Sequence, residues 1–245
     1  MSGFMSCESY MILSSLSSWK SNAIAALIRE NLKKAQEYLE EVERCELEED
    51  DESKPEYDIK YESLIPVLKR KIPLKAHAHR ADDMFTAIRI AKEFNLKLTL
   101  DHCTEGHLVL DELIEEGYPL IVGPSLSERS KVELRNLTFE TAGILSNAGA
   151  DVCLMTDHPV IPIQYLPICA GIAIKYGMKE EKALESITIN PARVLGIDDR
   201  VGSIEVGKDA DIILVNIEEK LDNITMLPNL NEIANLVYNT SGRNV

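Results

Sequence analysis

The sequence is poor in positive charge: its 245 residues carry 26 Lys and Arg against 41 Asp and Glu, for a formal net charge of -15. A nucleic-acid partner or an anionic membrane surface calls for clustered basic side chains, so this balance argues against both. No apolar run is long enough to cross a bilayer, and no basic residue precedes the weakly apolar N-terminal stretch, as a signal peptide would require. We therefore expect a cytoplasmic protein.

The sequence also lacks two local patterns that would point to other classes of protein. Its five cysteines are odd in number, scattered and free of CxxC spacing, so they predict neither a disulfide framework nor a structural zinc site, and they fit a reducing compartment. No glycine-rich phosphate loop follows any expected strand, which disfavours a flavodoxin-like open sheet that binds an anionic ligand.

The first part of the chain, residues 1–70, is expected to hold helices and an acidic linker. Apolar residues at helical spacing predict a long helix over 21–42. The run 46–55, reading ELEEDDESKP, has the composition of a solvated loop. A short helix over 62–68 is expected to lead into the first strand.

From residue 71 to residue 196 the chain alternates between apolar strands and amphipathic helices. The predicted strands are 72–77, 96–102, 118–122 and 151–156, and the helices that follow them are 82–94, 108–116, 141–148 and 164–176. Two short helices follow, 179–187 and 191–195, the second with Pro191 as its first residue. Four such units in a row favour an α/β fold with a parallel sheet covered by helices.

The character of the sequence changes in the last part, residues 197–245. The stretch 201–215 has the turn residues and short apolar runs of small antiparallel strands, and residues 236–238 offer one more. We expect this tail to form a separate small β element.

Side chains that bind metals gather where the predicted strands end. In a regular first strand, Lys75, His77 and His79 share one face, because side chains alternate with a period of two. His102 ends the second strand, and Asp157 follows the fourth. The carboxyl ends of parallel strands meet at one rim, so these groups are expected to converge.

Imidazoles and a carboxylate together are a ligand set for catalytic Zn²⁺ or a related divalent ion. Such an ion lowers the pKa of water and polarises a carbonyl. Each residue also has a plainer interpretation, since a single strand-end histidine is usually a hydrogen-bonded structural residue. Asp157 has the alternative of capping the next turn, and His107 and His158 that of a supporting or structural role.

Six segments of the sequence resemble the C-terminal part of the amidohydrolase superfamily, and within it the imidazolonepropionase-like and related cyclic-amide hydrolases. They are HAHRADD at 77–83, LDHCTEGH at 100–107, VGPSL at 122–126, MTDHPV at 155–160, ITINPARVLGI at 187–197 and VGSIEVGKDADIILV at 201–215. The resemblance implies a metal-dependent hydrolase on a (β/α)8 barrel with a small β-sandwich. No His-x-His pair precedes residue 77, so we expect the C-terminal half of the barrel and part of the sandwich.

The resemblance also implies roles for individual residues. His77, His102 and Asp157 correspond to metal ligands, with zinc favoured over iron or manganese. Asp157 would also take the proton of the attacking water as general base. His102 or His79 would stabilise the developing oxyanion. The candidate substrate-binding residues are Arg80, His107 and His158.

The function implied by the resemblance is hydrolysis of a non-peptide C–N bond in a small amide or cyclic amide. An alternative of a different class is a truncated, catalytically inactive remnant or binding protein. Half a barrel leaves an open sheet with an exposed edge and apolar face, and a homo-oligomer or upstream sequence would be needed to cover them.

Overall fold

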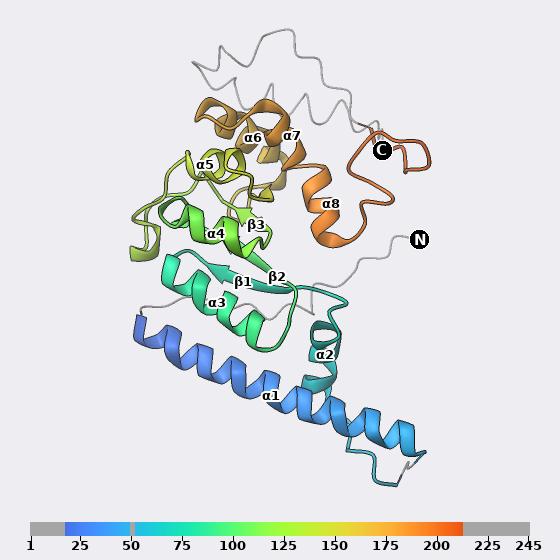
Figure 1. The fold of residues 1–245 in the computed structure, drawn as a ribbon. Helices are drawn as coiled ribbons and strands as arrows, with labels where there is room; N and C mark the ends of the chain where they lie inside the picture. The colour runs from blue at the N-terminus through green and yellow to red at the C-terminus, as the bar shows by residue number, and fades with distance from the viewer. Residues whose placement is uncertain (1–17, 50–51, 213–245) are drawn as a thin grey trace. The chain divides into compact units, whose positions relative to one another are not determined.

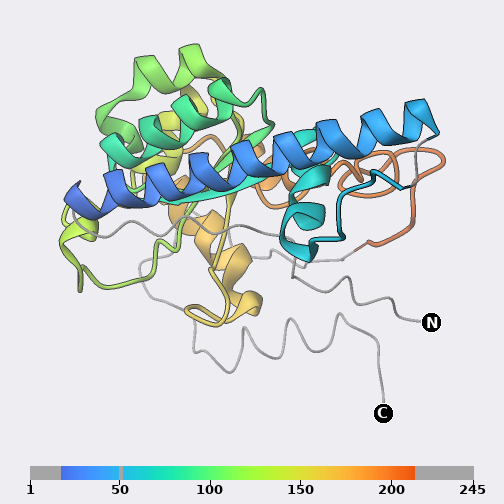
Figure 2. The same ribbon diagram turned by 90° about the horizontal axis from the view of Figure 1, so that it is seen from below.

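The computed structural model describes residues 18–49 and 52–212 and is drawn in Figures 1 and 2. The chain forms two compact units whose boundary in the sequence falls between Leu120 and Ile121. The domain division expected from the sequence, with boundaries after residues 70 and 196, stays a prediction. No helix within the described ranges combines the length and the apolar character needed to cross a membrane.

The first unit begins with two helices, α1 (Ser18–Glu48) and α2 (Ile59–Leu68). Helix α1 packs against α2 and against the later helix α3, as Figures 1 and 2 show. Between residues 25 and 35 its buried side chains recur every three or four residues, as a helix with one covered stripe requires: Ala25, Ile28, Leu32 and Ala35. Helix α2 starts before the predicted residue 62, because the carboxylate of Asp58 caps it by accepting the N–H groups of Lys60 and Tyr61.

The rest of the first unit is a strand, helix and strand that continue into a further helix. The elements are β1 (Leu74–Ala78), α3 (Ala81–Glu93), β2 (Leu98–His102), the 3-10 turn η1 (Gly106–Leu108) and α4 (Leu110–Glu116). Strand β1 pairs in parallel with β2, in a register that sets Leu74 opposite Leu98 and Ala78 opposite His102. Helix α3 connects the two strands and packs on both. The parallel orientation expected from the sequence is confirmed for this pair of strands.

The second unit carries the remaining elements. They are β3 (Leu120–Val122), which begins at the boundary, η2 (Val132–Leu134), α5 (Thr141–Asn147), β4 (Val152–Leu154), η3 (Ile163–Tyr165), α6 (Leu166–Lys175), α7 (Glu180–Glu185) and α8 (Ile189–Leu195). Strands β3 and β4 are neighbours, and the N–H of Met155 donates to the carbonyl oxygen of Val122 over 3.0 Å. Helices α5, α6 and α8 contact β4. All three residues of this strand are buried, so it lies in the core of the unit.

The structure corrects two predictions in the last part of the described chain. Helix α8 begins at Ile189, so Pro191 is its third residue and not its first; the position is still in the first turn, where a missing N–H costs nothing. Residues 201–212 form turns and contain no strand. Gly202 and Gly207 have φ of 94° and 97° there, which bend the chain out of the extended conformation. The predicted strand residues 213–215 and 236–238 lie outside the described residues.

Four of the five cysteines lie within the described residues. Cys45, Cys103, Cys153 and Cys169 are all buried. Cys7 lies outside the described residues. Burial raises the pKa of the Cys169 thiol to about 11, because the charged thiolate is poorly solvated there. These thiols therefore behave as small apolar core groups.

Candidate metal centre

Strand β1 separates an apolar face from a polar one, as the sequence predicts. Leu74, Ala76 and Ala78 are buried, whereas Lys75 and His77 are only partly buried on the opposite face. His79 lies one residue beyond the end of the strand and is 4% exposed. The strand thus delivers two imidazoles to its carboxyl end.

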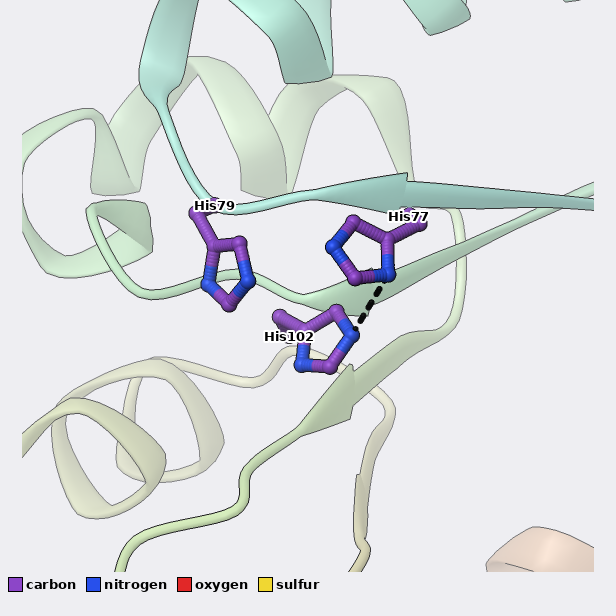
Figure 3. Close-up of side chains that lie close together, drawn as sticks. All are labelled: His77, His79 and His102. Carbon is purple, nitrogen blue, oxygen red and sulfur yellow. Dashed lines mark hydrogen bonds between the residues drawn. The ribbon is translucent and has the colours of Figure 1, made fainter. Parts of the chain in front are cut away.

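Strand β2 brings the third imidazole to the same place. His102 is the last residue of β2, opposite Ala78 in the register, and it is 4% exposed. Its Nε2 lies 2.9 Å from Nδ1 of His77, the contact marked in Figure 3. Two imidazole nitrogens at this distance share one proton, which one donates and the other accepts. His77 and His102 therefore already direct nitrogen atoms at a common point.

His79 completes a cluster of three rings. Its ring stacks on that of His102 with 4.3 Å between centroids, and its centroid lies 5.0 Å from that of His77. One nitrogen from each of the three histidines can be chosen so that all lie within 4.8 Å of one another. Figure 3 shows the three side chains converging from the ends of β1 and β2. The first unit therefore brings together the three histidines that were expected to converge.

The donor set of this cluster fits a divalent transition metal. Neutral imidazole nitrogen is a preferred ligand of zinc, and also of iron. With Zn–N bonds of about 2.0–2.1 Å, two nitrogens of a tetrahedral site lie roughly 3.3 Å apart, a little wider than the 2.9 Å between His77 and His102. Binding an ion between these two rings requires the loss of their shared proton and a small separation of the rings.

An ion pair lies on the same two strands. Nζ of Lys75 is 3.0 Å from Oδ2 of Asp101, and Asp101 is opposite His77 in the register. Burial raises the pKa of the Asp101 carboxyl, and the positive charge of Lys75 opposes that effect. Lys75 thereby compensates a carboxylate that is only 14% exposed and adjacent in sequence to His102.

The chain turns sharply after β2. His102 and Cys103 have φ of 76° and 48°, values that are uncommon for residues other than glycine. The turn places Thr104 Oγ1 2.7 Å from Nδ1 of His79. It also lets Oε2 of Glu105 accept the N–H of Ala81 in the first turn of α3, over 3.0 Å. This turn ties the end of β2 to the end of β1.

Sequence reasoning singled out the segment LDHCTEGH but took only its histidines as site residues. Asp101, Thr104 and Glu105 were missed. Their positions next to a strand-end histidine in the sequence were a usable signal, since the side chains around metal-ligating histidines commonly orient them.

Two candidate substrate-binding residues lie in the first unit. Arg80 makes a bidentate ion pair with Asp82, with Nε 2.9 Å from Oδ1 and Nη2 3.0 Å from Oδ2. That hydrogen-bonded cation lowers the pKa of the Asp82 carboxyl. His107 is partly buried within η1. Their contact with a substrate stays a prediction.

The other two candidates, Asp157 and His158, lie in the second unit beyond β4. The strand ends at Leu154 and not at the predicted residue 156, and Asp157 has φ of 53°. Its carbonyl oxygen accepts the N–H of Val160 over 2.8 Å, closing a turn. Both side chains are exposed. The predicted grouping of Asp157 with the histidines of the first unit stays a prediction.

Comparisons with known proteins identify relatives. The chain is 40% identical to an amidohydrolase of known structure from Thermotoga maritima MSB8, with a TM-score of 0.78 over 83% of this chain and 55% of that one. It is 28% identical to amidohydrolase tasK of Hapsidospora irregularis over 67% of this chain and 17% of that protein. It is 32% identical to an imidazolonepropionase of Thermoplasma volcanium over 42% of this chain and 26% of that protein.

These matches confirm the resemblance and the α/β fold expected from the sequence, part of a (β/α)8 barrel. The chain spans about half the length of the Thermotoga structure and a smaller share of the two other relatives. The sequence model of the amidohydrolase family matches residues 65–245. Since this match takes in well over half of the chain, including both strands that carry the histidine cluster, the chain belongs to the amidohydrolase family.

Proposed function

We propose that this chain contributes a metal site and catalytic groups to the hydrolysis of a C–N bond in a small amide or cyclic amide. The observation that carries the proposal is the cluster of His77, His79 and His102, whose ligand nitrogens lie within 4.8 Å of one another. The membership of the chain in the amidohydrolase family supports it. The similarity to an imidazolonepropionase supports a cyclic amide as the substrate class.

The proposed metal ligands are His77, His102 and Asp157. The hydrogen-bonded contact between the first two supports their assignment, because it already directs a nitrogen of each ring toward the other. Two imidazoles and one carboxylate favour zinc, with iron or manganese as alternatives. A bound divalent ion would lower the pKa of water toward neutrality and polarise the substrate carbonyl.

The protein's own groups would move the protons and hold the substrate. Asp157 would act as the general base and take a proton from the attacking water, which needs a carboxylate within hydrogen-bond reach of that water. His79 or His102 would donate a hydrogen bond to the carbonyl oxygen as it gains negative charge. Arg80, His107 and His158 would contact the rest of the substrate. Because Arg80 is paired with Asp82, a substrate anion would have to share or displace that carboxylate.

Turnover by the full chain tests the proposal. The zinc-loaded protein should hydrolyse at least one member of a panel of amides, lactams and cyclic imides. Asp157→Asn should lower kcat by about 100-fold or more, since positioned general bases contribute at least that much. Asp199→Asn is the matched control, because it removes an exposed carboxylate from the same unit, and it should leave the rate unchanged.

Two results would overturn the proposal. One is the absence of turnover across the panel by protein that holds zinc, which would leave the alternative of a catalytically inactive, binding-only protein. The other is an Asp157→Asn variant that is as active as the Asp199→Asn control.

A further inference from the structure

A short hydrogen bond between buried groups joins His79 of the cluster to Thr104. Nδ1 of His79 lies 2.7 Å from Oγ1 of Thr104. The two residues are 4% and 3% exposed, so solvent has little access to either partner. A hydrogen bond this short between buried groups fixes the orientation of the imidazole ring.

The backbone on both sides of Thr104 is tied to the end of β1. The N–H of Cys103 donates to the carbonyl oxygen of Ala78 over 3.1 Å, and the N–H of Glu105 donates to that of His79 over 2.9 Å. The positive φ of His102 and Cys103 is what turns the chain so that both bonds form. An unfavourable backbone conformation that places one hydroxyl against one imidazole points to a specific role for that contact.

The direction of this hydrogen bond follows from the requirement that the buried hydroxyl hydrogen of Thr104 has an acceptor. Across residues 18–49 and 52–212, His79 is the one hydrogen-bond partner of the Thr104 side chain. Were Nδ1 to carry the proton, the buried hydroxyl hydrogen would be left without an acceptor, which is costly. The hydroxyl therefore donates to Nδ1. A neutral imidazole has a single N–H, so the proton of His79 is on Nε2.

We infer that Thr104 is a positioning residue that keeps His79 as an Nε2–H donor, leaving His77 and His102 as the imidazole ligands of the metal. The inference rests on the proposed function for what the donor does, which is to bind the substrate carbonyl oxygen as water adds to it. A donor held in place before the reaction stabilises that developing charge without reorganising. The cluster of three similar histidines thus divides into two ligands and one donor.

Nitrogen NMR of the full chain labelled with 15N-histidine tests the tautomer directly. The spectrum is recorded at about pH 8.5, two units above the reference pKa of histidine of about 6.5, and protonated and bare ring nitrogens resonate at well-separated frequencies. The His79 signals are assigned by their loss in His79→Gln. We expect a protonated Nε2 and a bare, hydrogen-bonded Nδ1, both before and after zinc is added. A protonated Nδ1, or loss of the Nε2 proton when zinc binds, would overturn the inference.

Two substitutions at Thr104 separate the hydroxyl from the shape of the side chain. Thr104→Ser keeps the donor and should retain the Nδ1 shift of the wild type. Thr104→Val removes it and should shift the Nδ1 resonance toward that of a nitrogen without a hydrogen bond. An unchanged Nδ1 resonance in Thr104→Val would overturn the inference. The wild-type spectrum remains a test even if the valine variant does not fold.

The kinetic consequence is separable from the spectroscopic one. In active protein, Thr104→Val should lower kcat about tenfold or more with little change in KM, as removal of an orienting partner does, and Thr104→Ser should restore most of the rate. Equal rates for valine and serine variants would overturn the role of Thr104. If the protein hydrolyses nothing but His79 has the predicted tautomer, the proposed function fails while the assignment of the hydrogen bond stands.

Discussion

Lys75 and Asp101 form an ion pair, with 3.0 Å between Nζ and Oδ2, on the two strands whose ends carry the histidine cluster. Asp101 is opposite His77 in the register and next to His102 in the sequence. The pair joins β1 to β2 through side chains on the polar face, while Leu74, Ala76 and Ala78 bury the other face. It thereby helps to fix the register on which the contact between the two histidines depends.

Removing the cation of this pair should destabilise the fold. Lys75→Met leaves the Asp101 carboxylate, which is 14% exposed, without its countercharge, and we expect a loss of about 2 kcal/mol in the free energy of unfolding in urea. Adding Asp101→Asn should recover part of that loss, because the uncompensated charge is gone. Lys97→Met, which changes an exposed lysine of the same unit, is the control. A Lys75→Met loss no greater than that of the control would show that the pair contributes little.

Gly123 permits β3 and β4 to come close at their ends. A Cβ at this position would overlap the carbonyl oxygen of Met155, and φ of Gly123 is 141°. Because that neighbour is backbone, it has little freedom to move aside, and Gly123→Ala should cost about 3 kcal/mol of stability. Gly149→Ala has a positive φ of 102° but no atom within 4 Å, so it should cost about 1 kcal/mol. The free energy of unfolding in urea measures both losses. Equal losses for the two variants would show that the close approach of β3 and β4 does not require glycine at position 123.

The ion pair between Arg80 and Asp82 should give a small, pH-dependent contribution to stability. The hydrogen bonds from Arg80 lower the pKa of Asp82 below its ordinary value of 3.8. The contribution is therefore fully present above the unfolded pKa and is lost as the pH falls through the lowered folded value. Since the Asp82 side chain is 51% exposed, solvent screening limits the effect to about 0.5 kcal/mol or less.

The free energy of unfolding of Arg80→Met, compared with wild type at pH 7, 5 and 3, measures that contribution. The difference should be equal at pH 7 and 5 and shrink toward pH 3. Arg89→Met is the control, because Arg89 donates to the hydroxyl of Thr86 and not to a carboxylate. A difference for Arg80→Met that does not change with pH would assign the role of Arg80 to packing.

The order of helices and strands could be predicted because apolar spacing reports which residues are buried. The same signal placed the starts of β1, β2 and β3 two residues too early. Leu96 shows why: it is 2% exposed, yet it precedes β2, and its N–H closes the end of α3 by donating to the carbonyl oxygen of Ala91. Burial does not distinguish a strand residue from a buried residue at the end of a helix.

The histidine cluster could be predicted because strand topology alone brings His77, His79 and His102 to one end of a parallel pair. Which of the three histidines are metal ligands and which is a hydrogen-bond donor could not be predicted from the sequence. Threonine is common in every environment, and only the distance from Thr104 to Nδ1 of His79 distinguishes it from any other buried hydroxyl. The ion pair of Asp101 likewise depends on the register, which the sequence pattern leaves open.

The central claim, that these side chains hold a metal, is tested most directly by elemental analysis of protein purified without chelator. The wild type should contain about one divalent ion per chain, as a single site of this ligand set requires. His77→Ala/Asp157→Ala should contain almost none, whereas His107→Ala, which removes an imidazole outside the proposed ligand set, should keep it. Metal-free wild type that also fails to take up added zinc, or a double variant with undiminished metal, would contradict the account.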